Sequence, residues 1–175
     1  MRKMKKLTAL VLSAVLLVTA TVAGTLAWFT DKTATITNTF TVGKVDINLA
    51  ETTGSDYKMI PGKVHAKNPT VTVTADSEDC YLFVKIEKSA NLDDFITYKV
   101  AAGWTELTGV TGVYYREAKA NDTFAVLKDN QVTVKTTVTN EMMTANGFTA
   151  PTLKFTAYAV QKEGVASAAV AWELI

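Results

Sequence analysis

The sequence predicts an all-β protein, a single jelly-roll-like β-sandwich with a short C-terminal helix and a signal peptide before it. Val, Ile, Phe, Tyr and Thr, the residues that favour extended backbone, dominate after residue 30, and only three Pro occur. Apolar and polar residues alternate in short segments. Gly, Asn, Asp and Pro punctuate these segments, and eight or nine short strands in one domain indicate a sandwich.

Residues 1–27 form the predicted signal peptide. A basic stub at 1–6 precedes an uncharged apolar run at 7–23, and the small residues Thr25 and Ala27 follow. This order is typical of secretory signals and predicts cleavage between Ala27 and Trp28. The alternative is a retained anchor, because 17 apolar residues are at the short end of the ~17–25 that span a bilayer. We therefore expect a secreted protein that contacts a membrane only through the uncleaved segment.

The predicted mature chain, residues 28–175, is mildly acidic. Without the four basic residues of the stub, 14 of the 18 Lys and Arg remain against 17 Asp and Glu, a net charge of −3. This balance argues against a nucleic-acid partner and against a polybasic membrane-surface binder. The mature chain is long enough for one domain with a substantial core, and we see no second domain.

The first predicted strand covers residues 33–40. Thr occupies its odd positions, Thr33, Thr35, Thr37 and Thr39, and its even face carries Ala34, Ile36, Asn38 and Phe40. Further strands are predicted from alternation at 42–49, 70–74, 80–87, 95–100, 111–117, 123–127, 131–138 and 152–160. Short helical turns are expected at 90–94 and 141–146, and Ser167 is the predicted N-cap of the C-terminal helix.

Few residues offer chemistry. His65 is the sole histidine and is expected in a loop, so no zinc motif can be assembled, and no Ser lies in a Gly-x-Ser-x-Gly nucleophile elbow. Cys80 has no intrachain partner, and we expect it to be a buried packing thiol, with intermolecular pairing as the alternative. The acidic turn at 76–79 matches no calcium loop. We therefore expect no catalytic residues, no metal site and no cofactor.

Three aromatic residues define an alternative function. Trp104 follows a glycine at an expected hairpin, and Tyr114 and Tyr115 lie on a strand that pairs nearby. Together they are a candidate patch for carbohydrate or a protein partner, although packing in a core or interface is the commoner role of such rings. This hypothesis describes a monomeric extracellular binding module.

The position of the first strand suggests a different function. Residues 28–41 directly follow the cleavage point, and a strand at a free end has N–H and C=O groups without partners. It either pairs within its own sheet or completes the sheet of a neighbouring copy, in which case main-chain hydrogen bonds provide affinity. A head-to-tail contact of the second kind does not close, so it builds a filament.

Four segments of the chain contain recognisable motifs: the signal-peptide end at 24–31, the block at 38–47 with its Thr-Phe, Gly and apolar-Asp-apolar strand, the Pro-Gly at 61–62, and the C-terminal stretch 157–161 with Gly164 and Trp172. These motifs resemble those of the TasA/camelysin family of secreted matrix proteins. The resemblance covers both ends of the chain, and covers the middle by strand pattern alone.

The resemblance implies a jelly-roll subunit of extracellular biofilm fibres, cleaved by a signal peptidase of the SipW type, whose N-terminal strand enters the next subunit. We therefore expect a head-to-tail homopolymer, with other matrix proteins or polysaccharide as further partners. Ile36 and Phe40 are the side chains expected to fill pockets of the acceptor. Camelysin-type relatives are associated with metalloprotease activity, but one His without a zinc motif leaves that function the least supported.

Overall fold

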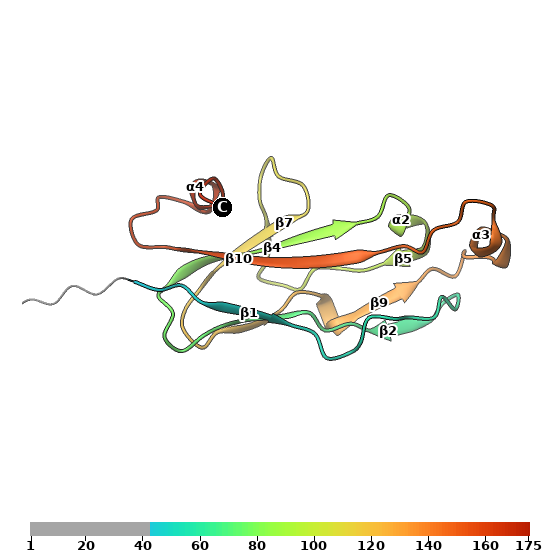
Figure 1. Cartoon of the computed structure of the whole chain (residues 1–175), viewed down its shortest axis with the longest axis horizontal. Coiled ribbons are helices and arrows are strands. Elements are labelled where there is room, and N and C mark those ends of the chain that lie inside the picture. Colours follow the sequence, from blue (N-terminus) through green and yellow to red (C-terminus); the bar gives the residue numbers. More distant parts are fainter. Residues whose placement is uncertain (1–42) are drawn as a thin grey trace, which may run out of the picture. The chain divides into compact units, whose positions relative to one another are not determined.

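The computed structural model describes residues 43–175, which form an all-β domain of three antiparallel sheets (Figure 1). The predicted signal peptide, its predicted cleavage site and the predicted strand at 33–40 lie outside the described residues. One sheet has the order β1-β3-β8, with strands Ile47–Ala50, Thr70–Val73 and Thr123–Ala125. The second has the order β10-β4-β7-β6, with strands Leu153–Gln161, Cys80–Lys88, Val113–Ala118 and Thr105–Glu106. The third has the order β2-β9-β5, with strands Val64–Ala66, Gln131–Val134 and Ile96–Thr97.

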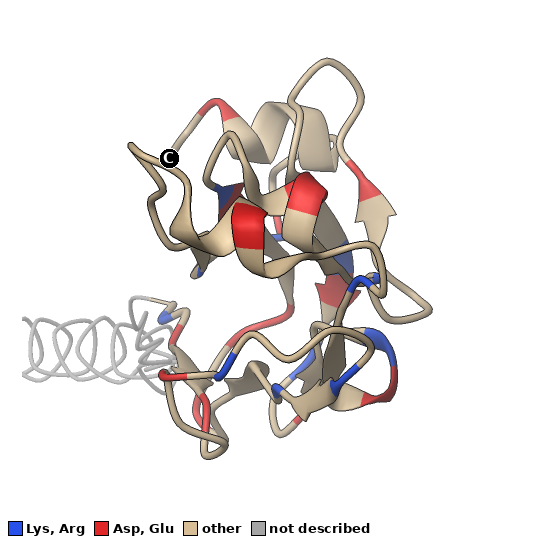
Figure 2. Cartoon of the chain, turned by 90° about the vertical axis from the view of Figure 1, so that its right-hand side faces the viewer, with Lys and Arg blue, Asp and Glu red and all other residues tan. Residues whose placement is uncertain are grey.

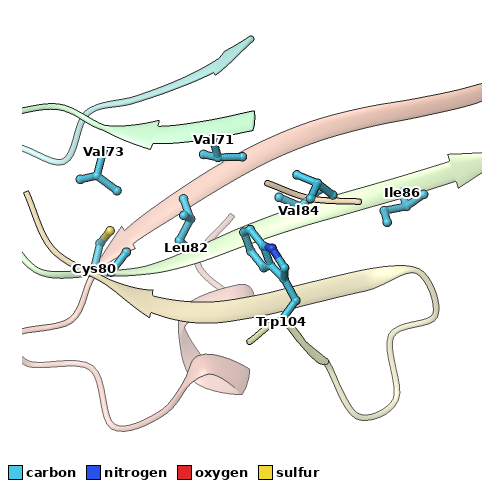
Figure 3. Close-up of a cluster of buried hydrophobic side chains, with 9 residues drawn as sticks. Val71, Val73, Cys80, Leu82, Val84, Ile86 and Trp104 are labelled. Atoms are coloured by element: carbon cyan, nitrogen blue, oxygen red, sulfur yellow. The ribbon is translucent and has the colours of Figure 1, made fainter. Parts of the chain in front are cut away.

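The main core lies between the first two sheets. β4 contributes the inward set predicted by alternation, which packs on two valines of β3 and on Trp104 (Figure 3): Cys80, Leu82, Val84 and Ile86. β10 adds the predicted inward face from the neighbouring strand: Leu153, Phe155, Ala157 and Ala159. These expectations are confirmed, because period-2 alternation reports which face of a strand is buried.

The outer face of the second sheet is also covered. Tyr81 and Phe83 of β4 pack beneath α4 (Ala168–Trp172), where Trp172 contacts Phe83 with ring centroids 5.3 Å apart. The Ser167 hydroxyl accepts a hydrogen bond from the Val170 N–H at 3.3 Å, so the predicted N-cap is confirmed. β4 is therefore buried on both faces, which explains its nearly continuous apolar sequence.

The third sheet packs with two short helices. A smaller cluster joins Phe95, Val134 and Val138 to side chains near α2 (Leu92–Phe95) and α3 (Asn140–Thr144). β9 ends at Val134, earlier than predicted, because the chain turns at 135–138 while keeping Val138 buried. β2 and β6 were not predicted, and a 3₁₀ turn (Lys128–Asn130) stands where a turn was expected. Within residues 43–175, no helix has the length and apolar character needed to cross a membrane.

Candidate functional site

The most prominent unpaired feature is one edge of β10. Asp79 O accepts from Lys162 N at 2.9 Å, and Thr152 O accepts from Ser89 N at 2.9 Å, so even-numbered residues of this segment bond towards β4. In an antiparallel ladder, the alternate residues direct their N–H and C=O groups the other way. On that side β10 has no strand partner among the described residues. The groups left open belong to Leu153, Phe155, Ala157, Ala159 and Gln161.

The other sheet edges are much shorter. β10 has nine residues, whereas the edge strands β1, β8, β6, β2 and β5 have four, three, two, three and two. β8 is also flanked by an additional segment, since Ala101 N donates to Val126 O at 2.9 Å. A long strand edge without charge blocks or proline is a template for another strand. Lys154 is the only charged residue of β10.

The inward face of β10 carries small side chains towards the Gln161 end of the strand. Ala157 and Ala159 face the core from β10, and Ile47 and Leu49 of β1 pack on the same cluster from the opposite sheet. β1 and β10 lie close together at the same side of the domain (Figure 1) but are not hydrogen-bonded to each other. Larger side chains carried by an added strand therefore have apolar surface from both sheets to contact.

A pocket of about 460 Å³ opens near the start of β10; we call it the end pocket. Its apolar walls come from the 55–59 loop, α2, β5, β9 and β10: Met59, Leu92, Ile96, Val132, Val134 and Leu153. Lys58 and Lys154 line it as exposed cations, and no ion pair of either is found within residues 43–175. An apolar hollow with a few polar groups is the usual form of a binding pocket.

His65 lies in this pocket, on β2 rather than in the expected loop. Its Nε2 donates to the Lys58 carbonyl oxygen at 2.8 Å, and the Tyr57 ring packs edge-on with centroids 5.3 Å apart. Nearby, the buried Lys67 ammonium forms a bidentate ion pair with Glu51 at 2.9 and 3.0 Å and lies 5.4 Å from the Tyr57 ring centroid. These contacts hold the 51–58 loop over β2.

The described residues do not fit a zinc site. Zinc in proteins takes three or four His, Cys, Asp or Glu ligands. Residues 43–175 contain no group of three or more such side chains placed to hold a metal ion. His65 is the sole histidine of the whole chain, and its Nε2 is already bonded to a backbone carbonyl. Cys80, the sole cysteine, is fully buried in the core, as predicted for a packing thiol.

The structure does not bring the three candidate aromatic residues into one exposed patch. Trp104 is only 9% exposed, packs in the main core, and donates from Nε1 to Ala125 O at 2.9 Å. Tyr114 and Tyr115 are consecutive on β7, so Tyr114 faces the main core and Tyr115 faces the layer under α4. Alternation of side chains along a strand separates them. The ligand-contact hypothesis for this trio is therefore corrected to a packing role.

One comparison with known proteins matches a protein family. The family model described as Camelysin metallo-endopeptidase matches residues 3–93, just over half of the 175 residues. The match includes the strand predicted at 33–40 and the domain from β1 through β4. No curated protein and no solved structure matches the chain.

Proposed function

The chain belongs to the camelysin family, and on that premise we propose that it is a secreted structural subunit of extracellular matrix or surface fibres. In this proposal, residues 33–40 of one copy add as a strand to the sheet of the next copy. Because the donating and accepting surfaces differ, the contact is head-to-tail and repeats into a filament.

The open edge of β10 is the observation that carries the proposal. The donor segment has eight residues and the open edge belongs to a strand of nine. Added main-chain hydrogen bonds would satisfy the five residues of β10 whose polar groups point away from β4. Ile36 would then lie near Ala157 or Ala159, and Phe40, four residues along the donor, near Leu153 or Phe155. Each large side chain would bury apolar surface worth roughly 1.5–3 kcal/mol.

The direction of the chain agrees with antiparallel addition. A Cβ at Gly43 would lie 3.1 Å from the Gln161 side-chain oxygen, so the chain enters the domain beside the end of β10. A donor segment that leaves this end and meets the opposite end of the next copy passes Leu153 first and Gln161 last. Residue 40 of the donor then lies nearest Leu153 and residue 33 lies nearest Gln161. The donor therefore runs opposite to β10, and the two strands are antiparallel, like all pairs in this sheet.

Filament formation by the mature chain from Trp28 tests the proposal. We expect fibres of the wild-type protein in electron micrographs, and none from the double variant Ile36→Asp with Phe40→Asp. The matched control is Thr35→Asp with Thr37→Asp, which adds the same charge to the opposite face and should still form fibres. Normal fibres from the Ile36/Phe40 variant would overturn the donor role, as would a wild-type chain that stays monomeric at every concentration.

Location and processing form a second part of the proposal. We infer that a SipW-type signal peptidase releases the chain outside the cell by cutting between Ala27 and Trp28. Sequencing the N-terminus of exported protein should give Trp-Phe-Thr-Asp. Recovery of the intact precursor from membranes would contradict this and favour the anchor.

We further propose that this member is not a peptidase, in spite of the family description. The support is that residues 43–175 hold no group of three or more His, Cys, Asp or Glu placed to bind a metal ion. The one His is bonded to a backbone carbonyl, and the one Cys has no exposed surface. After incubation with zinc and dialysis, the purified protein should retain well under one zinc per chain by elemental analysis. Stoichiometric zinc would contradict this part of the proposal and leave the fibre part standing.

A further inference from the structure

An exposed apolar group lies on and after α4, which covers the outer face of the second sheet near the end of β10 that is away from the end pocket (Figure 1). Val170 lies on α4, and Leu174 and Ile175 follow its last residue, Trp172. These three side chains are 43%, 65% and 51% exposed. We call these three residues the apolar knob. The inner side of α4 is occupied by Ala168 and Ala171, which are buried against the sheet, so the knob cannot also pack on its own domain.

The knob and the end pocket lie at opposite ends of β10. The pocket is lined by Thr152, Leu153 and Lys154, whereas α4 follows Gln161 (Figure 1). Eight residue steps separate the two ends of the strand, which is roughly 26 Å at about 3.3 Å per residue. One copy therefore cannot insert its own knob into its own pocket, but a second copy stacked end to end can.

The charges of the two surfaces are complementary. Glu173 lies within the knob segment and Glu163 lies in the turn before α4, and neither forms an ion pair within the part of the chain that the structure describes. The pocket offers the exposed Lys58 and Lys154 against one lining acid, Asp56. Figure 2 looks onto the pocket end of the domain, where both signs of charge are interspersed, so the attraction comes from the pocket rim rather than from a uniformly basic face.

We propose that the apolar knob of one copy inserts into the end pocket of the next copy, with Glu173 facing Lys58 and Lys154. This proposal rests on the head-to-tail assembly of the previous section and adds a second contact to it. Donor-strand addition and knob insertion require the same end-to-end stacking of two copies, because the chain enters the domain at the α4 end, beside Gln161. A knob of three side chains buries less than a standard interface of about 1,600 Å² and is weak alone. Donor-strand addition holds the two surfaces at a millimolar effective concentration, where a weak contact suffices.

The first experiment measures the contact without the donor strand. The mature Ile36→Asp, Phe40→Asp chain is compared by nitrogen-15 NMR at 20 µM and 1 mM. We expect concentration-dependent shifts at Ile96 and Leu153 in the pocket, and their loss when Leu174→Asp is added. The control Ala166→Asp places the same charge on an exposed residue outside the knob and should keep the shifts. Identical spectra at both concentrations overturn the knob contact, whatever the fate of the donor strand.

The second experiment measures its effect on assembly. With the donor strand intact, Leu174→Asp should raise the lowest concentration that gives filaments at least tenfold, and Ala166→Asp less than twofold. Lys58→Glu with Lys154→Glu should raise it similarly, and adding Glu173→Lys should recover most of the loss, because every interface in the polymer then has reversed charges. If adding Glu173→Lys to the Lys58→Glu, Lys154→Glu variant does not recover assembly, the proposed contact between these residues is overturned. If the wild-type chain forms no filaments but the NMR experiment shows the expected concentration-dependent shifts, the donor-strand proposal fails and the knob contact stands.

Discussion

The two lateral sides of the sandwich differ in whether a further segment of the chain covers the edges of the sheets. On the side of β6 and β8, the segment between β5 and β6 closes the gap: Val100 bridges to Leu127, Ala101 N bonds to Val126 O, and Trp104 enters the core. On the side of β1 and β10, no described segment does this, and the nine-residue strand β10 keeps an open edge. The closed side stabilises the monomer, whereas the open side leaves hydrogen bonds for a second chain.

The closed side also accommodates a cation at its rim. The Arg116 guanidinium carbon lies over the Phe124 ring, 3.4 Å from its centroid, and 5.4 Å from the Trp104 centroid. Burial lowers the pKa of Arg116, and its Nε has no hydrogen-bond partner among the described residues. Cation–π contact compensates part of this desolvation, so closing this side has an energetic cost that the open side does not carry.

The largest effect on stability is expected on the closed side. Trp104→Ala removes a buried indole, its hydrogen bond to Ala125 and the support of Arg116, so the free energy of unfolding should fall by about 3–5 kcal/mol. Trp104→Phe keeps most of the packing and should cost about 1–2 kcal/mol. Urea denaturation measures both, and a loss below 1 kcal/mol for Trp104→Ala would contradict the closing role of this segment.

Two glycines in the turn that leads into β7 provide a matched pair of substitutions on the closed side. Gly112 has φ +76°, and a Cβ there would lie 2.8 Å from the Ile86 carbonyl oxygen, while Gly109 has φ +81° and open space around it. Both Ala variants bear the strain of left-handed backbone, but Gly112→Ala also collides with β4. We expect losses of about 2–3 kcal/mol for Gly112→Ala and about 1 kcal/mol for Gly109→Ala by thermal unfolding. Equal losses would show that the turn yields without disturbing β4.

Cys80 reports whether the core between the two sides stays closed to water. Burial, with Asp79 and Asp122 nearby, raises the pKa of the thiol from 9.0 to about 11. Between these values the unfolded chain loses the proton and the folded chain keeps it, so stability falls as the pH rises from 9 to 11, by at most about 1.4 kcal/mol per pH unit. Cys80→Ala should show a shallower fall in the same range. Rapid reaction of native protein with a thiol reagent at pH 8 would contradict the buried placement.

Features that depend on neighbours in sequence were predictable, whereas features that depend on pairing with distant segments were not. The inward sets of β4 and β10 follow from alternation, and Ser167 follows from N-cap chemistry, because each depends on neighbours in sequence. β2 was missed because three residues carry no period and become a strand only by pairing with β9. The sequence left packing and ligand contact both open for Trp104, because the choice depends on contact with β7 and β8, which lie later in the chain.

The open edge itself is a property of strand order, which sequence alone did not give. The segment 152–160 was expected as a strand with the correct inward face, but nothing local indicates that β4 alone would be its partner. The end pocket arises in the same way, from five segments spread over residues 55–154. The sequence therefore predicted the donor candidate, and the fold supplies the candidate acceptor.

The smallest effect on stability, with a large effect on assembly, is expected at the open edge. Ala157→Pro removes an N–H that points away from β4, so the β10–β4 ladder survives and the free energy of unfolding should change by about 1 kcal/mol or less. Thr156→Pro is the matched control one residue away, and it removes an N–H bonded to β4 at a cost of about 3 kcal/mol. Urea denaturation and electron microscopy on the mature chain separate the two quantities. A stable Ala157→Pro protein that still forms normal fibres would place the acceptor somewhere other than β10. The reason is that a donor strand cannot pair with β10 where the Ala157 N–H has been replaced by a proline ring.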